Sequence, residues 1–240
     1  MQSGRETMIL IHENMSRGKT SKGWLNSFHT FSFGGFQDPT RMGFGPLRVI
    51  NEDWVIPGSG FSEHPHDNMD ILTVLLEGKL RHQDTMGNVS TFEAGEIQLM
   101  SAGTGVSHSE MNASEDETAH LLQIWMIPDV RGTAPRYQQA RLPAAEDTRD
   151  WTPIASGTEG EAPLHLLSDS SILIANPKEG DVSTIPARPG RLVFVHIVDG
   201  LARIDDENLR PGDGLQISDP ETLELSWLTN GKALLFDMPR

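Results

Sequence analysis

The chain has 240 residues, 37% of them hydrophobic and 22% charged, which suits one large globular domain or two smaller ones. Its 34 acidic and 19 basic residues give a formal charge of -15, which disfavours direct binding to nucleic acids and to anionic membranes. The sequence contains no cysteine, so it excludes disulfide frameworks and thiolate metal sites. A metal would therefore need nitrogen and oxygen ligands.

No segment has the pattern of a membrane span or a leader peptide. The longest apolar runs fall well short of the roughly 20 residues that cross a bilayer. The opening MQSGRETMIL lacks a basic region followed by a long apolar stretch. We therefore expect a cytoplasmic protein with no membrane partner. A protein partner in a regulatory complex stays compatible with the acidic charge.

Short apolar runs separated by turn signals occupy residues 71–112: ILTVLLEG, KLRHQDTMGN, VSTFEAGE, IQLMSAGTG and VSHSEMN. Each run predicts a strand, because a helix would need apolar residues at a period of 3.6 together with capping residues. Turn chemistry recurs at Glu77-Gly78, Gly87-Asn88 and Ala94-Gly95. This spacing of about 8 to 10 residues is typical of an antiparallel sandwich or barrel.

A second set of apolar runs follows the segment 128–151, in which the stretch PRYQQA, residues 135–140, is expected to form a short helix. Residues 191–239 then repeat the earlier pattern. ILTVLLEGKLRHQD and VFVHIVDGLARIDD each contain an apolar strand, an acidic residue followed by glycine, and a strand with alternating polar positions. The sequence therefore predicts two related β units in one chain.

Two pairs of candidate metal ligands lie in the first unit. In an extended strand the side chains of His64 and His66 point to the same face. Pro65, which has no amide proton, suits the edge of a sheet. His108 and Glu110 repeat the same spacing in VSHSEMN. Together the pairs predict four inward-pointing ligands.

Three imidazoles and one carboxylate suit Fe(II), Mn, Co, Ni, Cu or Zn rather than Ca or Mg. Iron is the first choice, and an octahedral ion held by four side chains would keep positions open for substrate and dioxygen. Two simpler interpretations stay open. The four residues could be ordinary polar groups at the mouth of a β-sandwich, or a metal could serve a structural purpose alone.

The motif spacing resembles that of a known family. Gly58 is separated from His64 by five residues, and His108 from Asn112 by three, as in the two cupin motifs. Segments similar to the pirin family of bicupins are GWLNSFHTFSFGGFQDP, LRVINEDWVIPGSGFSEHPH, MGNVSTFEAGEIQLMSAGTGVSHSE and LLQIWMIPD. They cover most of the first 130 residues.

The resemblance implies an all-β fold of two cupin domains, each a jelly roll or double-stranded β-helix. It implies an N-terminal domain, residues 1–130, that carries a metal, usually iron. Residues 131–240 would form a degenerate, metal-free C-terminal cupin domain. The family's metal ligands map by motif to His64, His66, His108 and Glu110.

Bacterial members of the family resemble quercetin 2,3-dioxygenases, which open the central ring of a flavonol with dioxygen and release carbon monoxide. The implied partners are a small aromatic substrate and O2, and Glu110 would be the catalytic base that takes the proton of the 3-hydroxyl. Asp67 and Asp70 stand where such sequences usually carry an arginine and a glutamate, so the substrate stays open. The alternative is a non-catalytic, metal-binding regulatory protein, because the mammalian pirin is described as a nuclear transcription co-regulator.

Several other residues have less specific assignments. Asn112 is expected to bond to backbone or to orient a ligand. Trp54, Phe61 and Met69 either line an apolar pocket or pack in the core. His196, in the second unit, is expected to be a packed or hydrogen-bonded strand residue. No site role is predicted for the remaining histidines, which are expected at the surface or in hydrogen bonds: His12, His29, His82, His120 and His165.

Overall fold

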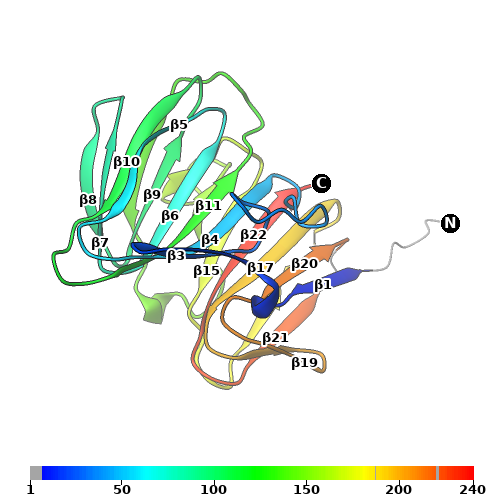
Figure 1. Cartoon of the computed structure of the whole chain (residues 1–240). Coiled ribbons are helices and arrows are strands. Elements are labelled where there is room, and N and C mark those ends of the chain that lie inside the picture. Colours follow the sequence, from blue (N-terminus) through cyan, green and yellow to red (C-terminus); the bar gives the residue numbers. More distant parts are fainter. Residues whose placement is uncertain (1–6, 187, 220–221) are drawn as a thin grey trace. The chain divides into compact units, whose positions relative to one another are not determined.

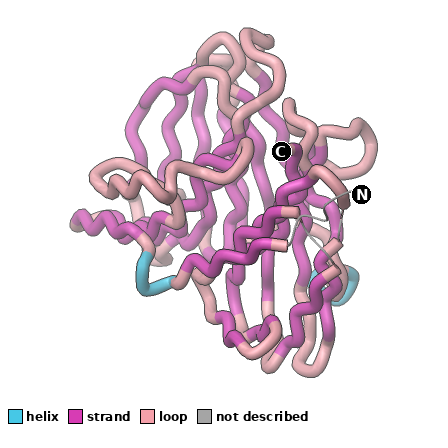
Figure 2. The backbone as a smooth tube through the Cα atoms, turned by 90° about the vertical axis from the view of Figure 1, so that its right-hand side faces the viewer, coloured by secondary structure: helices cyan, strands magenta, loops and turns pink. Residues whose placement is uncertain are grey.

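Strands make up nearly all of the regular structure (Figures 1 and 2). The structure, a computed structural model, describes residues 7–186, 188–219 and 222–240. Within these residues the only helical elements are the 3-10 turns η1 (Asn14–Ser16) and η2 (Ala145–Asp147). None of the described helices has the length and apolar character that crossing a membrane requires. The all-β class predicted from the sequence is confirmed.

Contacts divide the chain into two compact units. The first, the N-terminal unit, comprises residues 18–142 and 166–168. The second, the C-terminal unit, comprises the described residues of 1–17, 143–165 and 169–240. This grouping by contacts differs from the predicted domain boundaries, which stay a prediction.

The N-terminal unit is a sandwich of a seven-stranded and a four-stranded sheet. In sheet order, the larger sheet consists of β12 (Arg136–Arg141), β9 (Glu96–Ser101), β6 (Asp70–Glu77), β11 (Ala119–Met126), β4 (Leu47–Val55), β3 (Leu25–His29) and β2 (Gly18–Lys22). The smaller sheet consists of β5 (Gly60–His66), β10 (Val106–Asn112), β7 (Lys79–Asp84) and β8 (Val89–Glu93). Val55 and Leu121 of the larger sheet share a core with Leu80 and Phe92 of the smaller one.

The C-terminal unit has the same two-layer construction. Its larger sheet consists of β1 (Met8–His12), β20 (Gly214–Ser218), β17 (Arg191–Asp199), β22 (Lys232–Pro239), β15 (Ser171–Ala175), β13 (Thr152–Ser156) and β14 (Leu164–His165). Its smaller sheet consists of β16 (Val182–Ile185), β21 (Leu223–Trp227), β18 (Ala202–Ile204) and β19 (Glu207–Leu209).

The strand orders of the two units correspond. The order β9-β6-β11-β4 in one larger sheet matches β20-β17-β22-β15 in the other. The smaller sheets match as β5-β10-β7-β8 and β16-β21-β18-β19. Each strand of the first set is therefore equivalent to a strand of the second, which confirms the two related β units expected from the repeated sequence pattern.

Two strands pair across the predicted domain boundary. β1 pairs with β20, with Met8 opposite Ser218, and so belongs to the C-terminal unit. β12 pairs with β9, with Gln139 opposite Gln98, and so belongs to the N-terminal unit. The helix predicted for 135–140 is wrong, because residues 136–141 form β12. Its Gln, Ala and Arg residues favour a helix, but intrinsic propensity amounts to only fractions of a kcal/mol per residue, and pairing along β9 outweighs it.

Apolar side chains fill the C-terminal unit at the strands equivalent to those of the candidate ligands. β16 and β21, the counterparts of β5 and β10, have the sequences VSTI and LELSW. Ile185, Leu225 and Trp227 are buried in the core of this unit. The indole nitrogen of Trp227 donates a hydrogen bond to Ser183 Oγ at 3.0 Å. These strands therefore form a packed core rather than a polar site.

Replacing Trp227 by alanine should lower the free energy of unfolding by about 3–5 kcal/mol, because it leaves a cavity in this core. It also removes the hydrogen-bond donor to Ser183. Chemical denaturation followed by circular dichroism measures the change. Met15, whose side chain is 90% exposed, provides the control, and Met15→Ala should change stability by less than about 0.5 kcal/mol. Equal stability of the two variants would contradict the packed-core assignment.

Candidate metal centre

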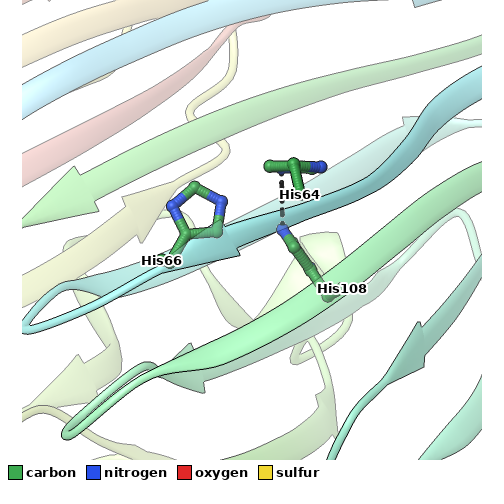
Figure 3. A group of neighbouring side chains, drawn as sticks. All are labelled: His64, His66 and His108. Atoms are coloured by element: carbon green, nitrogen blue, oxygen red, sulfur yellow. Dashed lines mark hydrogen bonds between the residues drawn. The ribbon is translucent and has the colours of Figure 1, made fainter.

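Antiparallel pairing of β5 with β10 brings the predicted histidines together. His108 lies directly opposite His64, and Ser107 lies opposite Pro65. β5 is an edge strand of its sheet, a position that tolerates Pro65 because proline cannot donate a ladder hydrogen bond. Figure 3 shows the rings of His64 and His66 on β5 gathered with that of His108 on β10.

A glycine permits the close approach of these two strands. Gly60 lies opposite Met111, and the register shifts between His108 and Glu110. A Cβ atom on Gly60 would lie 2.2 Å from the carbonyl oxygen of Glu110. Any larger residue would therefore push β5 away from β10 and separate the ligand strands.

Imidazole nitrogens of His64, His66 and His108 lie within 4.8 Å of one another. His64 Nδ1 lies 2.8 Å from the carbonyl oxygen of Ser62, so it donates its proton there and leaves a lone pair on Nε2. This Nε2 lies 3.2 Å from His108 Nε2. His66 Nε2 is buried and has no hydrogen-bond partner. Three converging nitrogen donors of this kind fit a transition-metal ion.

Burial favours the neutral form of two of these imidazoles. Together with like-charge repulsion from the neighbouring His108 and His64, it lowers the pKa of His66 to about 4. It lowers the pKa of His108 to about 3, with His64 and His82 acting in the same direction. Neutral imidazole is the form that binds metals. Both side chains are therefore available as ligands at neutral pH.

Glu110 is buried among amide donors. Gln98 Nε2 donates to its Oε1 at 2.7 Å, and Gln123 Nε2 donates to its Oε2 at 2.6 Å. The Glu110 carboxylate also forms a second potential ligand group with His108 and His82. His108 is common to both groups, so it connects the two predicted pairs. Coordination of one ion by all four predicted side chains stays a prediction.

His82 has no predicted site role, yet it lies beside two of the predicted ligands. It is fully buried on β7, directly opposite Glu110 of β10. Its Nε2 lies 2.9 Å from Asp84 Oδ2, and its ring centroid lies 4.7 Å from that of Tyr137. The alternation along KLRHQD could have revealed it, because His82 shares the inward face of the strand with Leu80 and Asp84.

A row of buried polar side chains crosses the larger sheet of the same unit. Five neighbouring strands place these residues opposite one another in register: Gln98, Thr73, Gln123, Asn51 and His29. Gln98, Thr73 and Gln123 all donate hydrogen bonds to Glu110. A His29 ring nitrogen bonds to Asn51 Oδ1 at 2.8 Å. Polar groups are costly to bury unless they are hydrogen-bonded, so this network indicates a site rather than ordinary packing.

A cavity of about 220 Å³ opens on this row. Its wall includes His29, Asn51 and Gln123 from the row. Phe33 and Phe61 provide aromatic surface in the same cavity. Because Gln123 both lines the cavity and donates to Glu110, it connects the cavity directly to the candidate metal centre.

The sequence left open whether Trp54, Phe61 and Met69 line a pocket or pack in the core, and the structure gives both outcomes. Phe61 lines the cavity. Trp54 instead stacks on the ring of His120, with 4.2 Å between centroids. Met69 packs against a buried cluster that includes Ile71. Only the phenylalanine among these three is therefore in position to contact a ligand in this cavity.

The residues that were not predicted to be ligands include Asn112 and several histidines, and most of them form the hydrogen bonds expected from the sequence. Asn112 Nδ2 donates to the backbone carbonyl oxygens of Val55 and Glu117, at 2.9 and 2.8 Å, which confirms the expected backbone bonding. Three of the remaining histidines bond to neighbouring side chains as expected, in the pairs His12 with Gln216, His29 with Asn51, and His120 with Glu52. His196 is buried on β17, as predicted for a packed strand residue.

Two family models match the chain. The Pirin model covers residues 11–126, and the model of the quercetinase C-terminal cupin domain covers residues 153–238. A protein named quercetin 2,3-dioxygenase from Escherichia coli (strain K12) is 40% identical over 232 residues, which are 97% of this chain and 99% of that protein. The chain belongs to the pirin family. A pirin-like protein from Caulobacter vibrioides is 34% identical to this pirin over 221 residues, 92% of one chain and 95% of the other.

Solved structures share the fold of this pirin. The crystal structure of YhhW from Escherichia coli matches with a TM-score of 0.92 at 39% identity, covering 97% of this pirin and 98% of that chain. The crystal structure of the bacterial pirin YhhW in complex with nickel(II) matches with a TM-score of 0.91 at 38% identity, covering 97% and 99%. The predicted fold of two cupin domains is therefore confirmed.

A second buried carboxyl group of this pirin interacts with Glu110. Burial raises the pKa of Asp53 to about 7, against a hydrogen bond from Ser27 that lowers it. Repulsion from Glu110 and Glu52 contributes to this rise in pKa, and His120 opposes it. The ordinary value is 3.8, so the unfolded chain releases this proton at lower pH than the native protein does. The native state therefore loses stability as the pH rises from about 4 through about 7.

Replacing Asp53 by asparagine should remove this loss, because asparagine keeps the side-chain shape without the charge. The difference in unfolding free energy between the variant and the wild-type protein should increase in favour of the variant by about 2–3 kcal/mol from pH 5 to pH 8. Urea denaturation of the metal-free proteins at both pH values measures the gain. Asp116→Asn, at an exposed loop position, is the control. A gain no larger than that of the control would show that Asp53 ionises normally.

Proposed function

We propose that this pirin is a metal-dependent dioxygenase resembling quercetin 2,3-dioxygenase, which opens a flavonol-type ring with O2. The observation that carries the proposal is the convergence of imidazole nitrogens from His64, His66 and His108. The buried Glu110 and the cavity that shares Gln123 with it add an acceptor and a place for a substrate. Relatives named quercetin 2,3-dioxygenase and a pirin crystallised with nickel(II) support it.

The proposed ligands of the metal are His64, His66, His108 and Glu110. Fe(II) is the proposed ion, and Ni, Mn, Co, Cu and Zn suit the same nitrogen and oxygen donors. When bound, Fe(II) would supply Lewis acidity toward a substrate hydroxyl and a redox partner for dioxygen. In this proposal residues 1–130 form the cupin domain that carries the chemistry, residues 131–240 form a degenerate cupin domain, and the protein acts in the cytoplasm.

Glu110 is the proposed catalytic base, which accepts the proton of the substrate's 3-hydroxyl. Gln98 and Gln123 each donate to a different oxygen of its carboxylate. Oε1 also accepts from Thr73 Oγ1 at 3.2 Å, whereas Oε2 has one donor and so keeps a lone pair for a further hydrogen bond. The two amides also fix the plane of the carboxylate, which reduces the reorganisation needed when a substrate hydroxyl arrives.

Oxygen uptake and carbon monoxide release with quercetin test this function. Protein of measured metal content, loaded in turn with Fe(II), Ni(II), Mn(II), Co(II), Cu(II) and Zn(II), should turn over quercetin with at least one ion. A His64→Ala, His108→Ala double variant should lose both bound metal and activity. His120→Ala should retain both, because His120 bonds to Glu52 rather than to the histidine cluster. Turnover with none of the ions would favour the alternative, a non-catalytic metal-binding regulatory protein.

Glu110→Gln should retain part of the bound metal and lose turnover by at least about 100-fold, because a glutamine amide cannot accept the substrate proton. Metal analysis and steady-state kinetics on the same preparation separate the two effects. Glu93→Gln, at an exposed position of β8, is the matched control and should keep wild-type turnover. Full activity in Glu110→Gln would end its assignment as the base.

A further inference from the structure

The cavity of the N-terminal unit has a polar wall that the metal centre does not use. Asn51 and Asp53 on β4 lie opposite His29 and Ser27 on β3, in register, and all four line the cavity. His29 and Asn51 satisfy each other at 2.8 Å. The other cross-strand pair, Ser27 and Asp53, differs because it carries a carboxyl group. This pair is therefore the part of the wall that can recognise a ligand.

One oxygen of Asp53 lacks a partner. The residue is 1% exposed, and Ser27 hydrogen-bonds its carboxyl group. Oδ1 is buried and has no hydrogen-bond partner. A buried polar atom left in this condition costs free energy, and most proteins avoid it. Because Asp53 lines the cavity, this oxygen is the acceptor that its side chain has left for a ligand that binds there.

The surroundings of Asp53 restrict the chemistry of that ligand. The nearby negative charge of Glu110 disfavours an anion, and Lys22, which lines the same cavity, disfavours a cation. Phe33 and Phe61 offer aromatic faces. The volume of about 220 Å³ is below the roughly 300–1,000 Å³ typical of pockets for whole drug-sized ligands. A single neutral aromatic ring carrying a hydroxyl group fits these limits.

We infer that Asp53 Oδ1 hydrogen-bonds a hydroxyl group on an aromatic ring of the substrate, which enters this cavity. The inference rests on the proposed function and deepens it, because this hydroxyl is distinct from the one that Glu110 deprotonates. Gln123 joins the two groups, since it lines the cavity and donates to Glu110. A ring held at Asp53 therefore contacts the same wall that orients the proposed base.

A hydroxyl group suits Asp53 in both of its protonation states. Burial raises the pKa of this carboxyl group to about 7, so both states are populated near neutral pH. An ionised carboxylate accepts the hydroxyl proton in a hydrogen bond, and a protonated one donates to the hydroxyl oxygen. Binding of the ring therefore does not require one protonation state.

Two flavonols and two variants test the inference. Quercetin carries hydroxyl groups on its outer rings, whereas 3-hydroxyflavone has only the 3-hydroxyl. Dissociation constants are measured for both on metal-loaded protein without oxygen, by quenching of tryptophan fluorescence. Asp53→Leu, which keeps the approximate side-chain size and removes both oxygens, should weaken quercetin binding by about tenfold and 3-hydroxyflavone binding by less than about twofold. Glu52→Gln removes a buried carboxyl group on the same strand that bonds to His120 and should leave both dissociation constants unchanged.

The wild-type protein provides a test that needs no variant, because it should bind quercetin about tenfold more tightly than 3-hydroxyflavone. Equal binding of the two flavonols, equal effects of the two substitutions, or no saturable quercetin binding would each overturn the inference. Quercetin turnover is measured separately. Selective weakening in Asp53→Leu without wild-type turnover would retain the ring site and reject the dioxygenase. Turnover with no effect of Asp53→Leu on binding would retain the dioxygenase and reject the ring site.

Discussion

The candidate site depends on the antiparallel register of β5 and β10. Side chains alternate along a strand, so a slip of one residue would turn His108 away from the face that carries His64 and His66. The observed register sets His64 directly opposite His108. Gly60 makes this register possible, because its missing side chain allows β5 to approach the carbonyl oxygen of Glu110. The remaining features of the site are built around this pair of strands.

The same strand pattern supports two different interiors in this chain. In the N-terminal unit, Gln98 and Gln123 satisfy the carboxylate of Glu110 inside the sandwich. In the C-terminal unit, the equivalent strands bury Ile185 and Trp227 in an apolar core. Burying polar groups stabilises a fold less than burying apolar ones of the same size. The polar interior therefore favours a ligand site in the first unit, whereas the second unit keeps the architecture with an apolar core.

Local sequence patterns predicted the strands within residues 71–112 and 191–239. KLRHQDTMGN, for example, contains β7 (Lys79–Asp84), because its alternation and flanking turn residues are properties of a short segment. The segment 135–140 shows where such patterns stop being informative. Its Gln, Ala and Arg residues tolerate a helix, but its backbone pairs with β9, which lies far away in the chain. Pairing of this kind has no signature in the segment itself.

By itself, the sequence determined which side chains could act together within one strand. The spacing of His64 and His66, and of His108 and Glu110, follows from the period of two along any strand. Only the tertiary structure decided that β7 brings His82 opposite Glu110. It alone aligned Gln98, Thr73, Gln123, Asn51 and His29 across five strands. The physical reason is that contacts between strands depend on sheet order and register, which are set by the packing of the whole unit and not by any single stretch of residues.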